Sequence, residues 1–513
     1  MGYAPARPNH AGKLAADAHG CRKNPLSVFT LSVESSGIMT RHMLIRENSR
    51  ARLRTALLVS FGASVGMIWA QSDSNVLAIV GANLVDVQKG VSIEDSVVLT
   101  AGDRITSVGR AGELAIPTGA KVIDARGKWL IPGLVDMHVH VTSSLTAVPG
   151  FPALILYLAN GVTTVRDTGG NITVLRLLRQ DLQSGRQVGP RLFLAGMILD
   201  GNPAVSPGPH VIPVDSERRA ESAVNFLADQ GADFIKVYNN ISEPVLVTII
   251  KAAHARGLTV TGHVPRSITT THAVELGMDG LEHIRITGRE LLPLEEANKI
   301  DFLTLGPRET LLWQRFEIDS ISMNKVIGTI AGHRTFLDPT LVVDQETFKM
   351  TAEERSAEPN NRMLPKALLS RMMERDLPES WLPPKDLRDV AVAGFAKRLK
   401  FVAMCYRAGV RLITGTDGPG LGPTLPGYGL HTEMELFQEA GIPPVDVLRA
   451  ATMTAADALH AQQDLGGIVP GKFADMVILD ADPLRDIANA RRIYRIVKGG
   501  AVYDPRELIA RLH

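Results

Sequence analysis

Short apolar runs alternate with amphipathic helical segments between about residues 134 and 465 of the 513-residue chain. Segments with helical periodicity, such as 216–230, 243–256 and 445–459, lie between most of these runs. The runs are "GLVDMHVH", "GVTTVRD", "PRLFLAG", "FIKVY", "LTVTGH", "GLEHI", "TFLDPTLVV" and "GVRLITGTD". Eight strands, each followed by a helix, predict an α/β fold whose parallel sheet closes into a (β/α)8 barrel.

The pattern changes on both sides of this region, where short β-like runs such as "VLAIVGANLVDV" and "RRIYRIVKGGAVYDP" alternate with turns. We expect the two flanking pieces to pair into one small sheet domain. The predicted division is an N-terminal extension with a signal peptide over 1–70, sheet segments over 74–133 and 466–513, and the barrel over 134–465.

Two long intervals, 283–335 and 343–387, are interpreted as insertions after the sixth and seventh strands. They contain Trp313 and Trp381. These insertions either cover a substrate or are ordinary surface excursions, and the sequence leaves both interpretations open.

The N-terminal region has the layout of a secretory signal peptide. Five arginines between residues 41 and 54 precede an apolar stretch over 55–70, and polar residues follow. We expect cleavage after Ala70, export to the periplasm or the medium, and no stable membrane association afterwards. An uncleaved anchor is the alternative, although the stretch is short for a membrane span. Residues 1–38 lack any pattern, so translation is expected to start at Met39 or Met43.

The composition limits which partners and metal sites the chain can have. Its formal charge of +1 gives no excess of basic residues of the kind that binds nucleic acid. Two cysteines cannot build a disulfide framework or a thiolate zinc site, whereas 14 histidines leave metal binding by imidazole open. A homo-oligomer is also left open.

Polar residues lie at or near the carboxyl ends of the predicted strands, which share one face of a barrel. The spacing of His138 and His140 puts both side chains on the same face of their strand. Lys236 lies inside the apolar run "FIKVY", where an unpaired ammonium is costly. Six potential metal ligands therefore converge: His138, His140, Lys236, His263, His283 and Asp417. Each alone could be an ordinary polar rim residue, and His210 and His431, in predicted loops, could touch substrate.

These motifs, with "TGTDG" and "GGIVPGKFADMVILDADP", together resemble the amidohydrolase superfamily over about residues 76–504. The chain is most similar to the imidazolonepropionase-like branch, which includes Xaa-Pro dipeptidases and ochratoxin-type amidases. The resemblance implies a (β/α)8 barrel, a β-sandwich built from both chain ends, and a two-metal site. It implies that Lys236 is N-carboxylated and bridges the two cations.

The resemblance further places His138, His140 and Asp417 on one cation, and His263 and His283 on the other. Nitrogen and oxygen ligands without thiolate favour zinc, with cobalt, manganese or nickel as alternatives. Two cations would make a bridging hydroxide available near neutral pH, and Asp417 would act as the general base that passes its proton to the leaving nitrogen. Tyr238 shares the face of Lys236 and either donates to the oxyanion or substrate, or simply packs at the strand end.

The implied reaction is hydrolysis of an amide bond in a dipeptide or an N-acyl amino acid. A lactonase or another cyclic amide or ester hydrolase is the alternative on the same site. A mononuclear deaminase is disfavoured, because "TGHVPRS" has no glutamate shortly after His263 and a lysine occupies the fourth strand. A non-catalytic binding barrel would be marked by lost ligands, and all six are present.

Overall fold

A computed structural model of the chain describes residues 76–142, 151–284, 290–297, 299–300, 306–346, 350, 352–373, 387–419 and 424–513. The predicted signal peptide, the predicted start site and Trp381 lie outside these residues. Within them, no helix combines the length and apolar character that crossing a bilayer requires.

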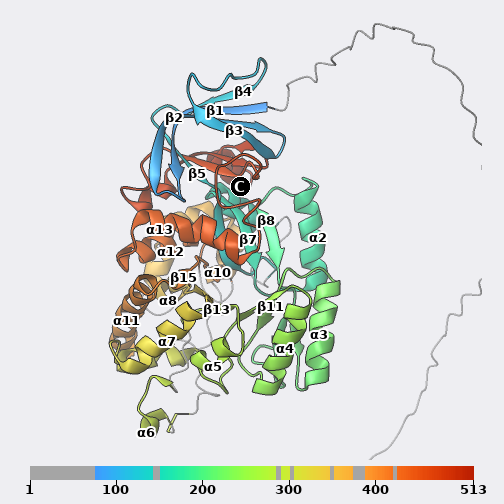
Figure 1. Ribbon diagram of the computed structural model, residues 1–513, viewed down its shortest axis with the longest axis vertical. Coiled ribbons are helices and arrows are strands. Elements are labelled where there is room, and N and C mark those ends of the chain that lie inside the picture. Colours follow the sequence, from blue (N-terminus) through green and yellow to red (C-terminus); the bar gives the residue numbers. More distant parts are fainter. Residues whose placement is uncertain are drawn as a thin grey trace, which may run out of the picture. The chain divides into compact units, whose positions relative to one another are not determined.

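Strands from both ends of the described chain form one eight-stranded sheet (Figure 1). Its order is β18-β17-β16-β5-β1-β2-β3, with β4 paired to β1. β16 runs antiparallel to β5, with Ile478 opposite Leu130, so the C-terminal strands continue the N-terminal sheet. Both of these residues are fully buried in a separate apolar cluster of this sheet. The strands are β1 (Val76–Asp86), β2 (Val91–Ala101), β3 (Arg104–Arg110), β4 (Lys121–Asp124), β5 (Trp129–Pro132), β16 (Met476–Leu479), β17 (Ile493–Lys498) and β18 (Ala501–Tyr503).

The middle of the chain forms two parallel sheets. The first contains β6 (Leu134–Val139), β7 (Val162–Asp167) and β8 (Arg191–Leu194). The second has the order β10-β9-β11-β12-β13-β14-β15. Its strands are β9 (Ile198–Asp200), β10 (Val211–Pro213), β11 (Phe234–Val237), β12 (Thr259–Gly262), β13 (Gly280–Glu282), β14 (Phe336–Asp338) and β15 (Arg411–Leu412).

Backbone hydrogen bonds also join the two parallel sheets at two places. After β15, the carbonyl of Thr414 accepts from Met137 N at 2.9 Å, and that of Gly418 accepts from His140 N at 3.1 Å. Directly before β11, Asp233 N donates to the carbonyl of Leu194, the last residue of β8, at 2.8 Å. Every residue of β6, β7 and β11 is buried, which is typical of parallel strands covered on both faces.

Helices alternate with these strands, and α3 and α4 lie side by side along one side of them (Figure 1). α2 shows why the sequence forms them: Ile172, Leu175, Leu178 and Leu182 recur on one buried face, and the side chain of Asn171 caps its first turn. The longer helices are α1 (Pro152–Ala159), α2 (Ile172–Gln183), α3 (Glu217–Asp229), α4 (Glu243–Ala255), α5 (Thr270–Glu275), α7 (Ile321–Gly332), α10 (Lys366–Met373), α11 (Arg388–Arg407), α12 (Tyr428–Glu439), α13 (Pro444–Arg449) and α15 (Pro505–Ala510). The predicted helix over 445–459 is α13 continued by a π-helical turn, Ala450–Thr454, and by α14 (Ala455–Ala458).

The insertion after β13 contains a 3-10 helix, Gly306–Arg315. Its Trp313 is only 1% exposed and packs edge-to-face against Phe316 and Phe401. The Trp313 side chain therefore belongs to the hydrophobic core. Coverage of a substrate by the insertions stays a prediction.

Candidate metal centre

A cavity of about 510 Å³ opens at the carboxyl ends of the parallel strands. Its volume is in the usual range for a small-molecule site. Eight of the nine residues singled out from the sequence line it, all except His431: His138, His140, His210, Lys236, Tyr238, His263, His283 and Asp417. The structure thus brings the predicted residues together, whereas their roles stay predictions.

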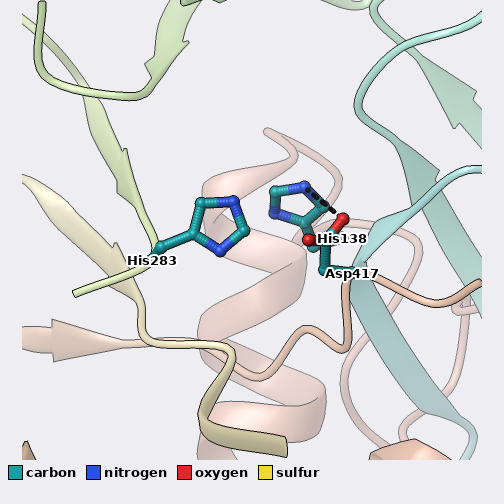
Figure 2. A group of neighbouring side chains, drawn as sticks. All are labelled: His138, His283 and Asp417. Carbon is teal, nitrogen blue, oxygen red and sulfur yellow. Dashed lines mark ion pairs between the residues drawn. The ribbon is translucent and has the colours of Figure 1, made fainter. Parts of the chain in front are cut away.

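Asp417 lies between the two histidines of the first parallel strand. Its Oδ1 is 3.1 Å from Nε2 of His140 and 3.6 Å from Nε2 of His138. Figure 2 shows His283 pointing from the end of β13 toward His138 and Asp417. One potential ligand atom from each of these three residues lies within 4.8 Å of the others, a grouping that could hold a metal ion.

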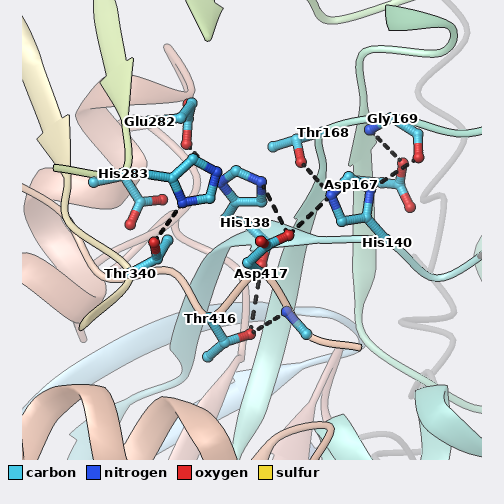
Figure 3. A network of polar contacts seen from close by, with 12 residues as sticks. His138, His140, Asp167, Thr168, Gly169, Glu282, His283, Thr340, Thr416 and Asp417 are labelled. Carbon is cyan, nitrogen blue, oxygen red and sulfur yellow. Dashed lines mark hydrogen bonds and ion pairs between the residues drawn. The ribbon is translucent and has the colours of Figure 1, made fainter. Parts of the chain in front are cut away.

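Two of these residues occupy unusual backbone conformations. Asp417 and His283 have φ angles of 53° and 64°, in the left-handed region that non-glycine residues rarely adopt. The turn at Asp417 is fixed by Thr416, whose hydroxyl donates to Asp136 at 2.8 Å and accepts from Gly418 N at 3.1 Å (Figure 3). Strained conformations of this kind persist where the surroundings determine them, and they are typical of functional sites.

The surroundings of Asp417 and His138 shift their pKa values so that the two groups have different charges near pH 7. Burial alone would raise the pKa of Asp417, but the hydrogen bond from His140 and the charges of His138 and His283 hold it well below its ordinary value. Burial, followed by the charge of Lys236, lowers the pKa of His138 to about 4. Asp417 is therefore ionised and His138 neutral near pH 7, which are the forms that bind a cation.

Lys236 lies in the middle of β11 and is 1% exposed. Its Nζ has no hydrogen-bond partner among the residues that the structure describes. Burial lowers the pKa of this amine from 10.5 to about 8, against the opposing charges of Glu282 and Asp417. A buried amine without a partner is a costly arrangement for structure alone.

Tyr238, His263 and His210 line another part of the cavity wall. The Tyr238 ring lies 4.1 Å from the His263 ring, centroid to centroid. Nδ1 of His263 is 2.7 Å from Oδ1 of Asn239. His210 lies between β9 and β10, is half-buried, and has a pKa lowered by burial. Its ring packs over Gly208, where any Cβ would come within 2.8 Å of it.

A charged layer next to His138 was missed by the sequence analysis. Glu282 Oε2 is 2.7 Å from Nδ1 of His138, and Arg166 Nη2 donates to Glu282 Oε1 at 2.7 Å. Arg166 Nη2 is also 3.7 Å from Asp338 Oδ2, so its guanidinium already lies between two carboxylates. Burial, followed by the charge of Glu282, raises the pKa of Asp338 well above its ordinary value. The signal was available: charged residues inside apolar runs, in "GVTTVRD" and "GLEHI", require buried partners.

Three further described histidines make contacts outside the cavity. His254 pairs with Asp279 at 2.8 Å and His272 with Glu243 at 3.0 Å, through exposed side chains of α4 and α5. His431 was expected in a loop that could touch substrate, and this was wrong. It lies within α12, is buried, and donates from Nε2 to the carbonyl of Asn160 at 2.9 Å, away from the cavity.

The curated proteins that resemble this chain include an imidazolonepropionase and several adenine deaminases. The chain is 23% identical over 412 residues to the imidazolonepropionase of Alkaliphilus oremlandii, covering 76% of this chain and 85% of that enzyme. It also matches adenine deaminases, among them that of Staphylothermus marinus, 28% identical over 201 residues, which is 37% of this chain and 32% of that enzyme. The chain spans only 12% to 39% of the length of the curated adenine deaminases that it matches.

Solved structures resemble it over most of its length. A putative prolidase from Bifidobacterium longum is 21% identical, with a TM-score of 0.62 over 86% of this chain and 99% of that one. A Xaa-Pro dipeptidase with methionine bound in its active site is also 21% identical, with a TM-score of 0.60 over 83% and 99%. At these identities the likeness establishes the fold alone. The sequence model of the amidohydrolase family matches residues 129–502, and the chain therefore belongs to the amidohydrolase family.

Proposed function

We propose that this protein is a metal-dependent hydrolase that cleaves the amide bond of a dipeptide or an N-acyl amino acid. The observation that carries the proposal is the convergence of four imidazoles, one carboxylate and one buried amine on a single cavity. Membership of the amidohydrolase family supports the same class of chemistry.

The donor set fits divalent cations. Imidazole nitrogens and carboxylate oxygens without a thiolate suit zinc, with cobalt, manganese and nickel as alternatives. We propose two cations, one held by His138, His140 and Asp417 and the other by His263 and His283. When bound, such a pair supplies hydroxide near neutral pH and polarises a carbonyl group.

Lys236 would join the two cations as a carbamate. The neutral amine attacks carbon dioxide: the C–N bond forms as one C=O π bond opens onto oxygen, and one N–H bond breaks with release of its proton. Two observations support this reaction: Nζ has no hydrogen-bond partner within the described residues, and burial lowers its pKa to about 8. Both favour the neutral amine that the reaction requires.

Asp417 is proposed as the general base. Its pKa is held well below the ordinary value, so it is ionised near neutral pH, the form that a general base requires. It would then deliver that proton to the leaving nitrogen, which is a poor leaving group without it. Tyr238 is proposed to donate a hydrogen bond from its hydroxyl to the substrate, with His210, in the loop between β9 and β10, as a second contact.

The finer architecture is part of the proposal. Backbone hydrogen bonds from Met137 to Thr414 and from Asp233 to Leu194 support closure of the two parallel sheets into one (β/α)8 barrel over 134–465. The eight-stranded sheet, which uses both chain ends, supports a β-sandwich over 74–133 and 466–513.

The substrate class is supported by the cavity wall. Beyond the eight predicted residues, the described lining is uncharged and includes Ile198, Pro207, Pro209 and Val211. A neutral, largely apolar side chain or acyl group suits this wall. The structural likeness to a putative prolidase and a Xaa-Pro dipeptidase points to the same substrates. A lactone or another cyclic amide or ester is the second candidate.

The test is hydrolysis of a panel of dipeptides and N-acyl amino acids, with lactones as the competing class, alongside metal analysis. We expect about two equivalents of metal per chain, and amide hydrolysis that is lost with a chelator and restored by zinc. Preferential lactone hydrolysis would favour the second candidate. A protein that binds no metal when metal is supplied would be a binding protein and not a hydrolase.

A further inference from the structure

Each of the four cavity histidines has its Nδ1 atom against a different group of the protein. Nδ1 of His138 is 2.7 Å from a carboxylate oxygen of Glu282, and Nδ1 of His140 is 3.0 Å from the carbonyl of Gly169. The other two contacts are His263 to Oδ1 of Asn239 at 2.7 Å and His283 to the hydroxyl of Thr340 at 2.6 Å. Figure 3 shows the surroundings of His138, His140 and His283.

The chemistry of these partners determines where the imidazole proton lies. A carboxylate, a backbone carbonyl and an amide oxygen can only accept, so the facing Nδ1 must carry the hydrogen. When such an imidazole is neutral, its lone pair is on Nε2, the atom that can bind a metal. His140 is set apart from the other three, because its Nε2 also lies 3.1 Å from Oδ1 of Asp417, a second acceptor. Thr340 is the only one of the four partners whose hydroxyl could either accept or donate.

We propose that the side chains on the Nδ1 atoms of His138, His263 and His283 are positioning residues that hold these three rings in one tautomer, protonated at Nδ1, so that the Nε2 lone pair of each would be available to a cation. The positioning residues are Glu282 for His138, Asn239 for His263 and Thr340 for His283. The inference rests on the proposed function and deepens it, because it names the groups that prepare the ligands before any metal arrives.

The surroundings of Glu282 keep its carboxylate a hydrogen-bond acceptor. Its Oε1 accepts hydrogen bonds from Nη2 of Arg166, at 2.7 Å, and from the hydroxyl of Thr261, and Oε2 is therefore available to His138. Arg166 is itself anchored through Nε to the carbonyl of Met137. An ion pair inside the protein keeps the carboxylate ionised, and an ionised carboxylate makes the stronger hydrogen bond to an imidazole N–H.

Thr340 is held in place from a different helix. Its φ of 46° is unusual for a β-branched residue. The next turn is fixed by Glu433 of α12, whose Oε2 accepts from Val342 N at 2.7 Å. This turn therefore holds the Thr340 hydroxyl next to His283, although the two residues follow different strands.

The decisive experiment compares two substitutions at Thr340 by zinc titration against a chelator dye. Thr340→Val keeps the shape and removes the hydroxyl, so zinc affinity at the His283 site should fall about 10- to 100-fold. Thr340→Ser keeps the hydroxyl, so its zinc affinity should stay within about threefold of the native value, a much smaller loss than that of the valine variant. Thr335→Val is the matched control: its hydroxyl donates to the carbonyl of Met278 at 3.2 Å, and zinc affinity should not change.

A second measurement distinguishes a positioning role of Thr340 from a general loss of structure in the variant. In the metal-free protein with ¹⁵N-labelled histidine, the ring nitrogens of His283 should show protonation at Nδ1, and Thr340→Val should shift this signal toward the other tautomer. A native His283 protonated at Nε2, or a valine variant with native zinc affinity and native tautomer, would overturn the inference.

Asn239 supplies an independent pair if Thr340→Val does not fold. Asn239→Leu removes the acceptor and should weaken zinc binding at the His263 site, whereas Asn239→Asp keeps an accepting oxygen and should retain it. Equal affinities for the two variants would count against positioning by hydrogen bonding. A native protein that binds no zinc would instead defeat the proposed function, so the two failures are distinguishable.

Discussion

Lys236→Met is expected to stabilise the metal-free protein and at the same time to abolish activity. Methionine is unbranched and close in length to the lysine stem, so it can occupy the same space without a charge. The buried amine has no hydrogen-bond partner in the described structure, so its removal breaks no such bond. The same change removes the atom that the proposed carbamate requires.

The size of the effect follows from the pKa of Lys236, which burial lowers from 10.5 to about 8. A difference of about 2.5 in pKa corresponds to about 3 kcal/mol of unfolding free energy. Below pH 8 the amine is protonated in both the native and the unfolded chain, so the native state bears this whole cost. Between pH 8 and 10.5 the native state binds fewer protons, so its stability rises with pH. The advantage of methionine should therefore shrink from about 3 kcal/mol at pH 7 to about 1.4 kcal/mol at pH 9.5.

The assay is urea unfolding of metal-free, bicarbonate-free protein at both pH values. Lys397→Met is the control of opposite sign, because Nζ of Lys397 donates to the carbonyls of Gln314 and Phe316, each at 2.7 Å. Its loss should cost about 1–3 kcal/mol. With zinc and bicarbonate present, the order should reverse, since only the native protein would gain stability from bound metal.

A Lys236→Met protein less stable than the native one at pH 7 would refute this reasoning. The same holds for a stability difference that does not change between pH 7 and 9.5. Either result would mean that the amine is solvated or paired, and the argument that burial makes Lys236 easier to deprotonate would fall with it.

Four further outcomes are expected. Asp417→Asn should lower kcat by about 10²–10⁴, the range of a lost general base; retained turnover would exclude that role. Tyr238→Phe should lower kcat about 10²-fold with unchanged metal content, whereas a residue that only packs would leave kcat unaltered. Burial lowers the pKa of His431 to about 3, so the native state binds fewer protons than the unfolded chain below pH 6.5 and loses stability as pH falls. Relative to His431→Gln, this loss should reach about 2 kcal/mol by pH 5 in urea unfolding. N-terminal sequencing of the naturally produced protein should begin after Ala70, and a mature chain that starts near Met1 would refute export.

The strand–helix alternation and the set of cavity residues could be predicted from the sequence because both depend on local information. Continuous apolar runs such as "FIKVY" predict buried parallel strands, and the i, i+2 spacing of His138 and His140 fixes their common face. Strand ends in a parallel sheet share one edge, so the position of Asp417 or His283 along the chain was enough to place each near the others. Lys236 was conspicuous because a charge inside an apolar run needs an explanation.

The partners of these residues were decided only by the tertiary structure. Glu282 meets His138 across 144 residues, and Thr340 meets His283 across 57. A hydrogen bond forms only within a few tenths of an ångström of its ideal length, and no local pattern encodes a distance between two different strands. The burial of Trp313 could not be predicted for a related reason. Hydrophobic contacts have no preferred direction, so the sequence does not indicate which apolar surface a tryptophan in an insertion will pack against. The sequence by itself determined which chemical groups reach the cavity, and the packing of distant elements decided how each group is oriented there.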